Sequence, residues 1–297
     1  MQLDLSRHLR VLLQPTQPLH ICLVGVGGTG SALAQSLCRL AWHCQQKGTE
    51  VRLVFIDPDR VELKNVGRQL YCLPECGQLK AETMARRMGA AFGLAIRAIP
   101  EAVSAAQIRA LWHLRGGSYF SAHSARAGTY LLVGAVDNHH ARQQLAEVTA
   151  ESSGAVWYLD CGNARSNGQV LLGNVAQAEH LRHVCADEMG LLAALPAPHL
   201  QAPALLAPDA SPQPALSCAE LTLREEQSLV INQMVASVAA QYVHDWLLRR
   251  ELHAYGTDFS LEPPALVTHV LTENSLATLT ERLGTPRPKR HKQKQAA

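Results

Sequence analysis

The chain of 297 residues is long enough for one large domain or two small ones. Hydrophobic residues make up 47% and charged residues 18%, a globular composition that excludes disordered and collagen-like chains. The formal net charge of +2 becomes −3 when five basic residues near the end are removed: Arg287, Lys289, Arg290, Lys292 and Lys294. A basic nucleic-acid-binding fold is therefore not indicated, and we expect no specific nucleic-acid partner.

The start of the chain, MQLDLSRHLR, lacks the apolar segment of a signal peptide. We therefore expect a cytoplasmic protein whose eight cysteines are core thiols, metal ligands or nucleophiles rather than disulfides. The uncharged stretch 190–208 approaches the length of a membrane span, but it contains four prolines. We interpret it as a surface loop or crossover and expect no membrane association.

Strands and helices alternate along the chain. Apolar runs without alternation, typical of buried parallel strands, predict strands at 20–25, 51–56, 95–99, 129–136, 155–160, 169–175 and 265–271. Helices are predicted at about 29–44, 78–92 and 138–152. This order predicts an α/β fold, with a Rossmann-like, doubly wound and mostly parallel sheet that helices cover on both faces.

The chain changes character at an Ala-, Leu- and Pro-rich stretch, residues 191–216. Beyond it, apolar residues on one face predict a helix from 218 to about 247, and Ser217 and Glu220 have capping-box spacing. We predict one domain over 1–283, made of a core at about 18–176, a Pro-rich crossover loop at 186–217, and a C-terminal helix and strand within 218–272. Residues 284–297 form a basic tail that we expect to be disordered.

Four glycines follow the first predicted strand: Gly25, Gly27, Gly28 and Gly30. They form G-x-G-x-x-G between a strand and a helix, the context in which this pattern binds nucleotides. Such glycines allow the backbone to approach phosphate closely, and the start of the helix supplies N–H groups. Asp57 ends the next strand, where an acid binds ribose hydroxyls in a Rossmann fold. An ATP-dependent enzyme and an NAD(P)-dependent oxidoreductase both fit these features.

The following segments distinguish the two enzymes. Residues 56–70 read IDPDRVELKNVGRQL, Gly77 and Lys80 come next, and residues 136–142 read VDNHHAR. In order and spacing these elements resemble the ThiF/MoeB family of ubiquitin-activating-enzyme-like adenylating proteins, over roughly residues 20–175. Residues 217–233 further resemble ThiF-related proteins of the bacterial PRTRC system.

The resemblance implies that a small ubiquitin-like or sulfur-carrier protein is the substrate. Its C-terminal carboxylate attacks the α-phosphate of ATP, which gives an acyl-adenylate and pyrophosphate. The resemblance also implies that Asp57 holds the ribose, that Asn65, Arg68 and Lys80 approach the phosphates, and that Asp137 positions Mg²⁺. The chemistry agrees, because preorganised cations stabilise the charge that builds on phosphates. The expected nucleotide-binding set also includes the four glycines, Asp59, Gln69 and Asn138.

Each of these side chains has a simpler interpretation. Asp59 can serve only to turn the loop after Pro58, and Arg68 and Lys80 can be solvated surface charges. Asp137 can be a helix N-cap. We expect Asn138 and Arg142 to steady the end of a strand and the start of a helix.

The cysteines determine the step after adenylation, since some family members pass the acyl group to a cysteine as a thioester. Cys218 is the first candidate because it falls at the predicted start of a helix, where the pKa of a thiol is lowered. Cys185 is the second, in a polar stretch with His180 and His183. An inert structural role is the alternative for both thiols. The remaining thiols of strands and helices are expected in the core: Cys22, Cys38, Cys44 and Cys161.

Two further features of the family are missing or incomplete. Many members bind zinc through pairs of C-x-x-C, which this chain lacks, and its Cys72 and Cys76 have C-x₃-C spacing. We expect ATP and Mg²⁺ as cofactors and no zinc. Homodimeric members supply an N-terminal arginine to the partner's site, so a homodimer is expected, with Arg7 or Arg10 as the candidate.

The sequence leaves three other functions open besides activation of a ubiquitin-like protein. A nicotinamide-dependent oxidoreductase explains the glycines and Asp57 but gives no role to Arg68, Lys80 and Asp137. A non-catalytic scaffold that binds nucleotide fits the missing zinc pairs. A family relative that acts on another carboxylate or on a modified tRNA base is the last alternative.

Overall fold

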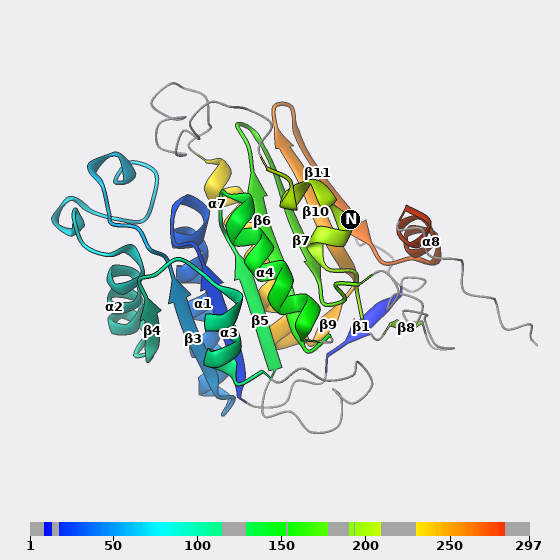
Figure 1. Ribbon diagram of the computed structural model, residues 1–297, viewed down its shortest axis with the longest axis horizontal. Helices are drawn as coiled ribbons and strands as arrows, with labels where there is room; N and C mark the ends of the chain where they lie inside the picture. Colours follow the sequence, from blue (N-terminus) through cyan, green and yellow to red (C-terminus); the bar gives the residue numbers. More distant parts are fainter. Residues whose placement is uncertain are drawn as a thin grey trace, which may run out of the picture.

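The computed structural model describes residues 9–13, 18–114, 129–152, 154–177, 190–192, 194–208 and 230–282. Within these ranges, an eight-stranded sheet forms the centre of the molecule (Figure 1). Its strands, in spatial order, are β11 (Pro264–Val270), β10 (Ala254–Leu261), β7 (Asn167–Gly173), β6 (Val156–Asn163), β5 (Thr129–Gly134), β2 (Leu19–Val24), β3 (Val51–Ile56) and β4 (Ile96–Ile99).

The sheet has a parallel and an antiparallel half. Strands β6, β5, β2, β3 and β4 are parallel neighbours. Strand β7 pairs antiparallel with β6, and β10 and β11 continue in antiparallel pairing. The prediction of a Rossmann-like, mostly parallel sheet is confirmed.

Helices cover both faces of this sheet, as predicted. One face packs against α1 (Gly28–Gln46), α2 (Lys80–Phe92) and α7 (Ile231–His244), and the other against α3 (Ala105–Trp112) and α4 (His139–Glu151). In Figure 1, α3 and α4 lie in front of the sheet. The apolar runs without alternation follow from this arrangement, because a strand that is covered on both faces has no polar side.

Strand β2 shows how the two cores are filled. Leu19, Ile21 and Leu23 point into the core beneath α1, whereas Cys22 and Val24 point into the core beneath α4. All five side chains are at most 2% exposed. Burying such an aliphatic side chain stabilises the fold by about 1.5–3 kcal/mol, so this strand anchors both layers and fixes the loop that follows it.

The C-terminal part departs from the sequence prediction in several places. We predicted one strand at 265–271, and the structure pairs it as β11 with β10, which we did not predict. Helix α7 begins at Ile231, and the predicted start near 218 with its capping box lies outside the described residues. The predicted helix continues as the π-helix η6 (Asp245–Arg249). Elements that the sequence analysis missed are α3, α8 (Glu273–Arg282) and a small sheet of β8 (Leu191–Leu192), β1 (Arg10–Leu12) and β9 (Glu251–Leu252).

The Pro-rich stretch is more buried than a surface loop. After β8 it forms α5 (Pro198–Gln201) and the 3₁₀ helix η5 (Pro203–Leu206). Ala194, Leu195 and Ala197 are 0% exposed, and a Cβ on Gly173 of β7 would lie 1.8 Å from the carbonyl oxygen of Pro196. Residues 194–198 therefore pack on the sheet, whereas residues 202–208 include no buried residue, so the surface-loop interpretation is wrong only for the first part of the stretch. In the described part of the chain, no helix combines the length and the apolar character needed to cross a membrane.

Candidate functional site

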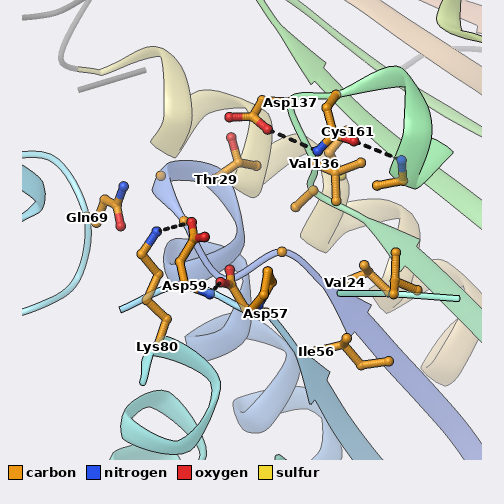
Figure 2. Close-up of a pocket in the computed structure, with 18 of the residues that line it drawn as sticks. Val24, Thr29, Ile56, Asp57, Asp59, Gln69, Lys80, Val136, Asp137 and Cys161 are labelled. Carbon is orange, nitrogen blue, oxygen red and sulfur yellow. Dashed lines mark hydrogen bonds and ion pairs between the residues drawn. The ribbon is translucent and has the colours of Figure 1, made fainter. Parts of the chain in front are cut away.

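A cavity of about 560 Å³ opens at the carboxyl ends of the parallel strands. Its walls come from the loops after β2, β3 and β5, from the end of β6 and from the start of α7. The helices that follow β2 and β5 cover opposite faces of the sheet, and ligands bind at such a point in open α/β folds. Figure 2 shows side chains from these loops converging on the cavity.

The glycine loop forms the floor of the cavity through close backbone packing. Gly25 has a φ of +84°, which a side chain would disfavour, and a Cβ on Gly30 would lie 1.9 Å from the carbonyl oxygen of Gly25. Helix α1 begins at Gly28, and its N-cap Gly27 makes no side-chain capping bond. The first turn of α1 therefore presents N–H groups and the positive end of the helix dipole to the cavity.

Asp57 lies at the end of β3 beside this loop. Its Oδ2 accepts a hydrogen bond from the backbone N–H of Val26 (2.7 Å), and its Oδ1 accepts one from that of Asp59 (2.9 Å). Burial raises the pKa of Asp57, while the charge of Lys80 and the two backbone bonds lower it in part. The carboxylate thus holds the glycine loop and the next loop together, and it lines the cavity where a ribose is expected.

Lys80 is the first residue of α2 and is only 6% exposed. Its Nζ bonds Oδ2 of Asp59 at 2.8 Å, and Figure 2 shows the two side chains directed toward each other. A buried ammonium at a helix N-terminus is disfavoured by both desolvation and the helix dipole. The interpretation of Lys80 as a solvated surface charge is therefore wrong. Asp59 holds this ammonium at the cavity wall, so its role is not limited to turning the loop after Pro58.

The loop between β3 and α2 carries three further predicted nucleotide-binding residues, Asn65, Arg68 and Gln69, of which two line the cavity. Asn65 is buried and lines the cavity, but its Oδ1 accepts the N–H of Glu62 and closes the 3₁₀ turn η1 (Leu63–Asn65). Gln69 lines the cavity beside Gly27. Arg68 is half-buried and is absent from the described lining of the cavity. The structure thus brings Asn65 and Gln69 to the cavity and leaves Arg68 outside it.

Asp137 and Asn138 follow β5 on the other side of the glycine loop. Asn138 is the N-cap of α4, because its Oδ1 accepts the N–H of Ala141 at 2.8 Å. The alternative that Asp137 caps the helix is thereby wrong. Asp137 is exposed at the cavity, and its Oδ1 accepts a long hydrogen bond of 3.4 Å from Nδ2 of Asn138. A carboxylate with spare lone pairs facing a phosphate site fits the oxygen ligands that Mg²⁺ prefers.

Arg142 forms hydrogen bonds that hold the loop after β5 in place. Its Nη2 donates to the carbonyl oxygen of Val136 at 2.8 Å, and its Nε donates to Oδ2 of Asp160 at 3.2 Å. Tyr158 donates to the same oxygen at 2.5 Å, and burial raises its pKa well above the usual range. The expected structural role of Arg142 is confirmed. Asp160 and Tyr158 lie within an apolar run and gave no sequence signal.

A second group that sequence analysis missed lies beside the first turn of α1. It consists of Thr29 in α1, Asn163 at the end of β6 and Asn232 in α7. Asn163 donates to Oδ1 of Asn232 at 2.6 Å, and Thr29 donates to the same atom at 3.1 Å. All three line the cavity.

The described cysteines are mostly buried. Cys22, Cys38, Cys44 and Cys161 are in the core as expected, and burial raises the pKa of each thiol. Cys161 also lines the cavity. Both thioester candidates, Cys218 and Cys185, lie outside the described residues, together with His180 and His183.

Cys72 and Cys76 are exposed and flank the 3₁₀ turn η2 (Leu73–Glu75). In the described ranges, histidine, cysteine and acidic side chains form no group of three that could hold a metal ion. Of the two arginines considered for action across a dimer, Arg7 lies outside the described residues. Arg10 pairs with Glu251 of β9 at 2.9 Å.

Comparison with solved structures supports the fold. PaaA matches with a TM-score of 0.53 and 14% identity, over 85% of this chain and 64% of PaaA. MccB of E. coli, in complex with MccA-N7isoASN, matches with a TM-score of 0.50 and 13% identity, over 86% of this chain and 65% of that one. The chain spans a little under two thirds of the length of these proteins.

Sequence comparison identifies the family. The tRNA threonylcarbamoyladenosine dehydratase of E. coli K12 is 38% identical over 77 residues, which are 26% of this chain and 26% of that protein. The ThiF family model matches residues 9–290, nearly the whole chain. The chain therefore belongs to the ThiF family.

Proposed function

We propose that the protein activates a carboxylate with ATP, by transferring the adenylyl group to it. The observation that carries the proposal is the buried ammonium of Lys80, which Asp59 holds at the wall of a cavity floored by a glycine loop. The ammonium uses one N–H bond on Asp59 and has further donors that an anion on the loop could accept. The ThiF family match over residues 9–290 supports ATP rather than a nicotinamide cofactor as the nucleotide.

The protein's own groups divide the work in this proposal. Asp57 accepts the ribose hydroxyls, the first turn of α1 holds phosphate oxygens, and Lys80 stabilises the charge of the leaving pyrophosphate. Asp137 would hold Mg²⁺, which supplies further charge neutralisation at the phosphates. An oxygen of the substrate carboxylate forms a bond to the α-phosphorus, and the bond from that phosphorus to the bridging oxygen breaks. The products are an acyl-adenylate and pyrophosphate.

The substrate that we propose is the C-terminal carboxylate of a small ubiquitin-like or sulfur-carrier protein. A groove of about 580 Å³ shares Asn163 with the cavity, and its lining includes Phe259 of β10 and Val267 of β11. Such a groove suits an extended chain whose last carboxylate reaches the cavity. MccB, whose fold this chain shares, is seen in complex with N-formylated MccA. We further propose that the protein acts as a homodimer, and that Cys218, or else Cys185, carries a thioester after adenylation.

Exchange of radiolabelled pyrophosphate into ATP tests the proposal. Exchange should require Mg²⁺ and a carrier that ends in a free carboxylate, and the same carrier with a C-terminal amide should be inactive because it lacks the attacking oxygen. Lys80→Ala and Asp137→Ala should each lower exchange about 10²- to 10³-fold. Undiminished exchange in both variants would sink these assignments. A thioester should be lost in Cys218→Ala while exchange persists.

Two observations support alternative functions, and the same exchange experiment tests them. Arg68 lies outside the described lining of the cavity, which favours a scaffold that binds nucleotide without catalysis. Binding of ATP with no exchange for any carrier would support the scaffold. If Arg68→Ala leaves exchange intact, only the role of Arg68 falls. Transfer RNA should also be tested as a substrate, because a segment of this chain is similar to the tRNA threonylcarbamoyladenosine dehydratase.

A further inference from the structure

Asn232 enters the wall of the cavity from a distant part of the chain. It lies in the first turn of α7 and is 3% exposed. A Cβ on Gly28 would lie 2.6 Å from its Nδ2 and 2.9 Å from its Oδ1. The amide therefore occupies the space beside the glycine loop that a side chain at position 28 would fill.

The hydrogen bonds of this amide fix which atom faces the ligand. Oδ1 accepts from Nδ2 of Asn163 (2.6 Å) and from Oγ1 of Thr29 (3.1 Å). Asn163 also donates to Thr29 at 3.3 Å, so the hydroxyl proton of Thr29 is directed to Asn232. With its oxygen used twice, Asn232 has only the two N–H bonds of Nδ2 left to offer.

That Nδ2 is buried and has no hydrogen-bond partner among the described residues. Leaving a buried donor unpaired is costly, and native proteins rarely do so without a reason. Asn232 lines the cavity, and its Nδ2 lies against Gly28, the first residue of α1. A ligand in the cavity would supply the missing acceptor.

The position of the donor defines the chemistry of that ligand. The first turn of a long helix offers further N–H donors and positive potential, and Asn232 itself has no acceptor to spare. A group made only of acceptors and carrying negative charge fits both features. A ribose hydroxyl or an adenine amino group would bring a donor to a place that already has donors.

We propose that Asn232 donates a hydrogen bond to an oxyanion seated on the first turn of α1, and that this oxyanion is a phosphate of the bound nucleotide. Thr29 and Asn163 are positioning residues, because they hold the amide with its N–H groups toward the ligand. The inference rests on the proposed function for the identity of the nucleotide. The carboxylate of the acyl substrate has the same acceptor chemistry and is the competing source.

Isosteric substitutions test the donor. Asn232→Asp keeps the shape but replaces the N–H groups with a negatively charged acceptor, and Asn232→Ala removes the amide without adding charge. Dissociation constants for ATP, inorganic pyrophosphate and adenosine are measured by calorimetry. A hydrogen bond to a charged group predicts about 10- to 100-fold weaker binding of ATP and pyrophosphate in both variants, with the larger loss in Asn232→Asp. Adenosine should bind as in the wild type.

The positioning residues have their own matched pair. Thr29→Val is isosteric and removes the hydroxyl donor, so ATP should bind several-fold more weakly. Thr29→Ser retains the hydroxyl and should restore the affinity. If Thr29 had only a structural role, Thr29→Val would lower the melting temperature of the ligand-free protein, and Thr29→Ser would not restore the affinity for ATP.

The outcomes separate this inference from the proposed function. Unchanged affinity for ATP and pyrophosphate in folded Asn232→Ala and Asn232→Asp proteins overturns the inference and leaves the proposed function intact. If only the KM of the acyl carrier rises, the donor serves the substrate carboxylate and the phosphate assignment is wrong. If the wild type binds pyrophosphate through Asn232 but not ATP, the proposed function fails alone. If the wild type binds neither, both fail.

Discussion

The two halves of the large sheet use their strands differently. In the parallel half, the strands are buried on both faces and their carboxyl ends form the cavity. In the antiparallel half, β10 and β11 form a hairpin whose outer strand exposes Leu266 and Val267 by 51% and 57%. Two glycines make the difference testable: a Cβ on Gly30, next to the cavity of the parallel half, would meet fixed backbone, whereas a Cβ on Gly168 of antiparallel β7 would meet a side chain that can move.

The largest expected effect comes from a methyl group added at Gly30 of α1, compared with one added at Gly168 of β7. A Cβ on Gly30 would meet the carbonyl oxygen of Gly25 at 1.9 Å, while a Cβ on Gly168 would meet the ring of Phe259 at 2.3 Å. We expect Gly30→Ala to cost more than about 4 kcal/mol, an exceptional loss for one substitution, and to abolish ATP binding. Gly168→Ala should cost about 1–3 kcal/mol, because the ring can shift.

Thermal unfolding and ATP calorimetry on the two glycine variants check this difference. Gly168→Ala is the control, since it adds the same methyl group to strand β7, where the facing atoms belong to a side chain. Equal losses of stability in both variants would contradict the distinction between backbone and side-chain contacts. Retained ATP binding in a folded Gly30→Ala protein would remove the glycine loop from the site.

A smaller effect is expected from Asp57, whose two oxygens both accept backbone N–H groups. Asp57→Asn turns one acceptor into a donor that faces an N–H, so we expect a loss of about 1–3 kcal/mol in stability and at least tenfold weaker ATP binding. Asp258→Asn is the control for stability, because the side chain of Asp258 is 52% exposed and an exposed ion pair contributes at most about 1 kcal/mol. Unfolding curves that coincide for the two variants would refute the structural role of Asp57.

The parallel half was predictable because its signals are local. Apolar runs marked the strands, and Gly93, in the left-handed conformation with φ 65°, ends α2 where predicted. Strand β10 was missed because its sequence, AYGTDFSL, is not an apolar run, even though it pairs with both β7 and β11. A single pattern therefore predicted β11 but missed its partner.

The same distinction holds inside the cavity. Asp57, Lys80 and Asp137 belong to short motifs, and the structure brings all of them to the cavity wall. Asn232 contacts Thr29 over 203 positions of sequence, so no local pattern indicates it. The motif also names Arg68 and Gln69 together, but the turn after η1 directs only Gln69 to the cavity. Spacing predicts which residues are near a site, whereas the path of the loop decides which of them face it.

The smallest expected effect is a pH dependence on the antiparallel side. His199 of α5 bonds the carbonyl oxygen of Ala176 through Nε2 at 3.3 Å, and burial lowers its pKa below the ordinary 6.5. The folded chain then binds this proton less readily than the unfolded chain. Its contribution is complete above pH 6.5 and is lost as the pH falls from 6.5 through the lowered pKa, by at most about 1.4 kcal/mol per pH unit.

His199→Gln keeps a donor for the carbonyl oxygen of Ala176 but does not titrate. Compared with the wild type, its melting temperature should fall less between about pH 7 and pH 5, the range in which an ordinary histidine gains its proton. His199 does not line the cavity in the described part of the chain, so the variant should bind ATP as the wild type does at neutral pH. Asp57 lines the cavity, and its raised pKa brings its protonation closer to neutral pH, so the proposed role of Asp57 as ribose acceptor predicts that ATP binding depends on pH. If the melting temperature of His199→Gln depends on pH as that of the wild type does, His199 is not the source of this pH dependence. If the variant binds ATP more weakly, His199 also affects the cavity.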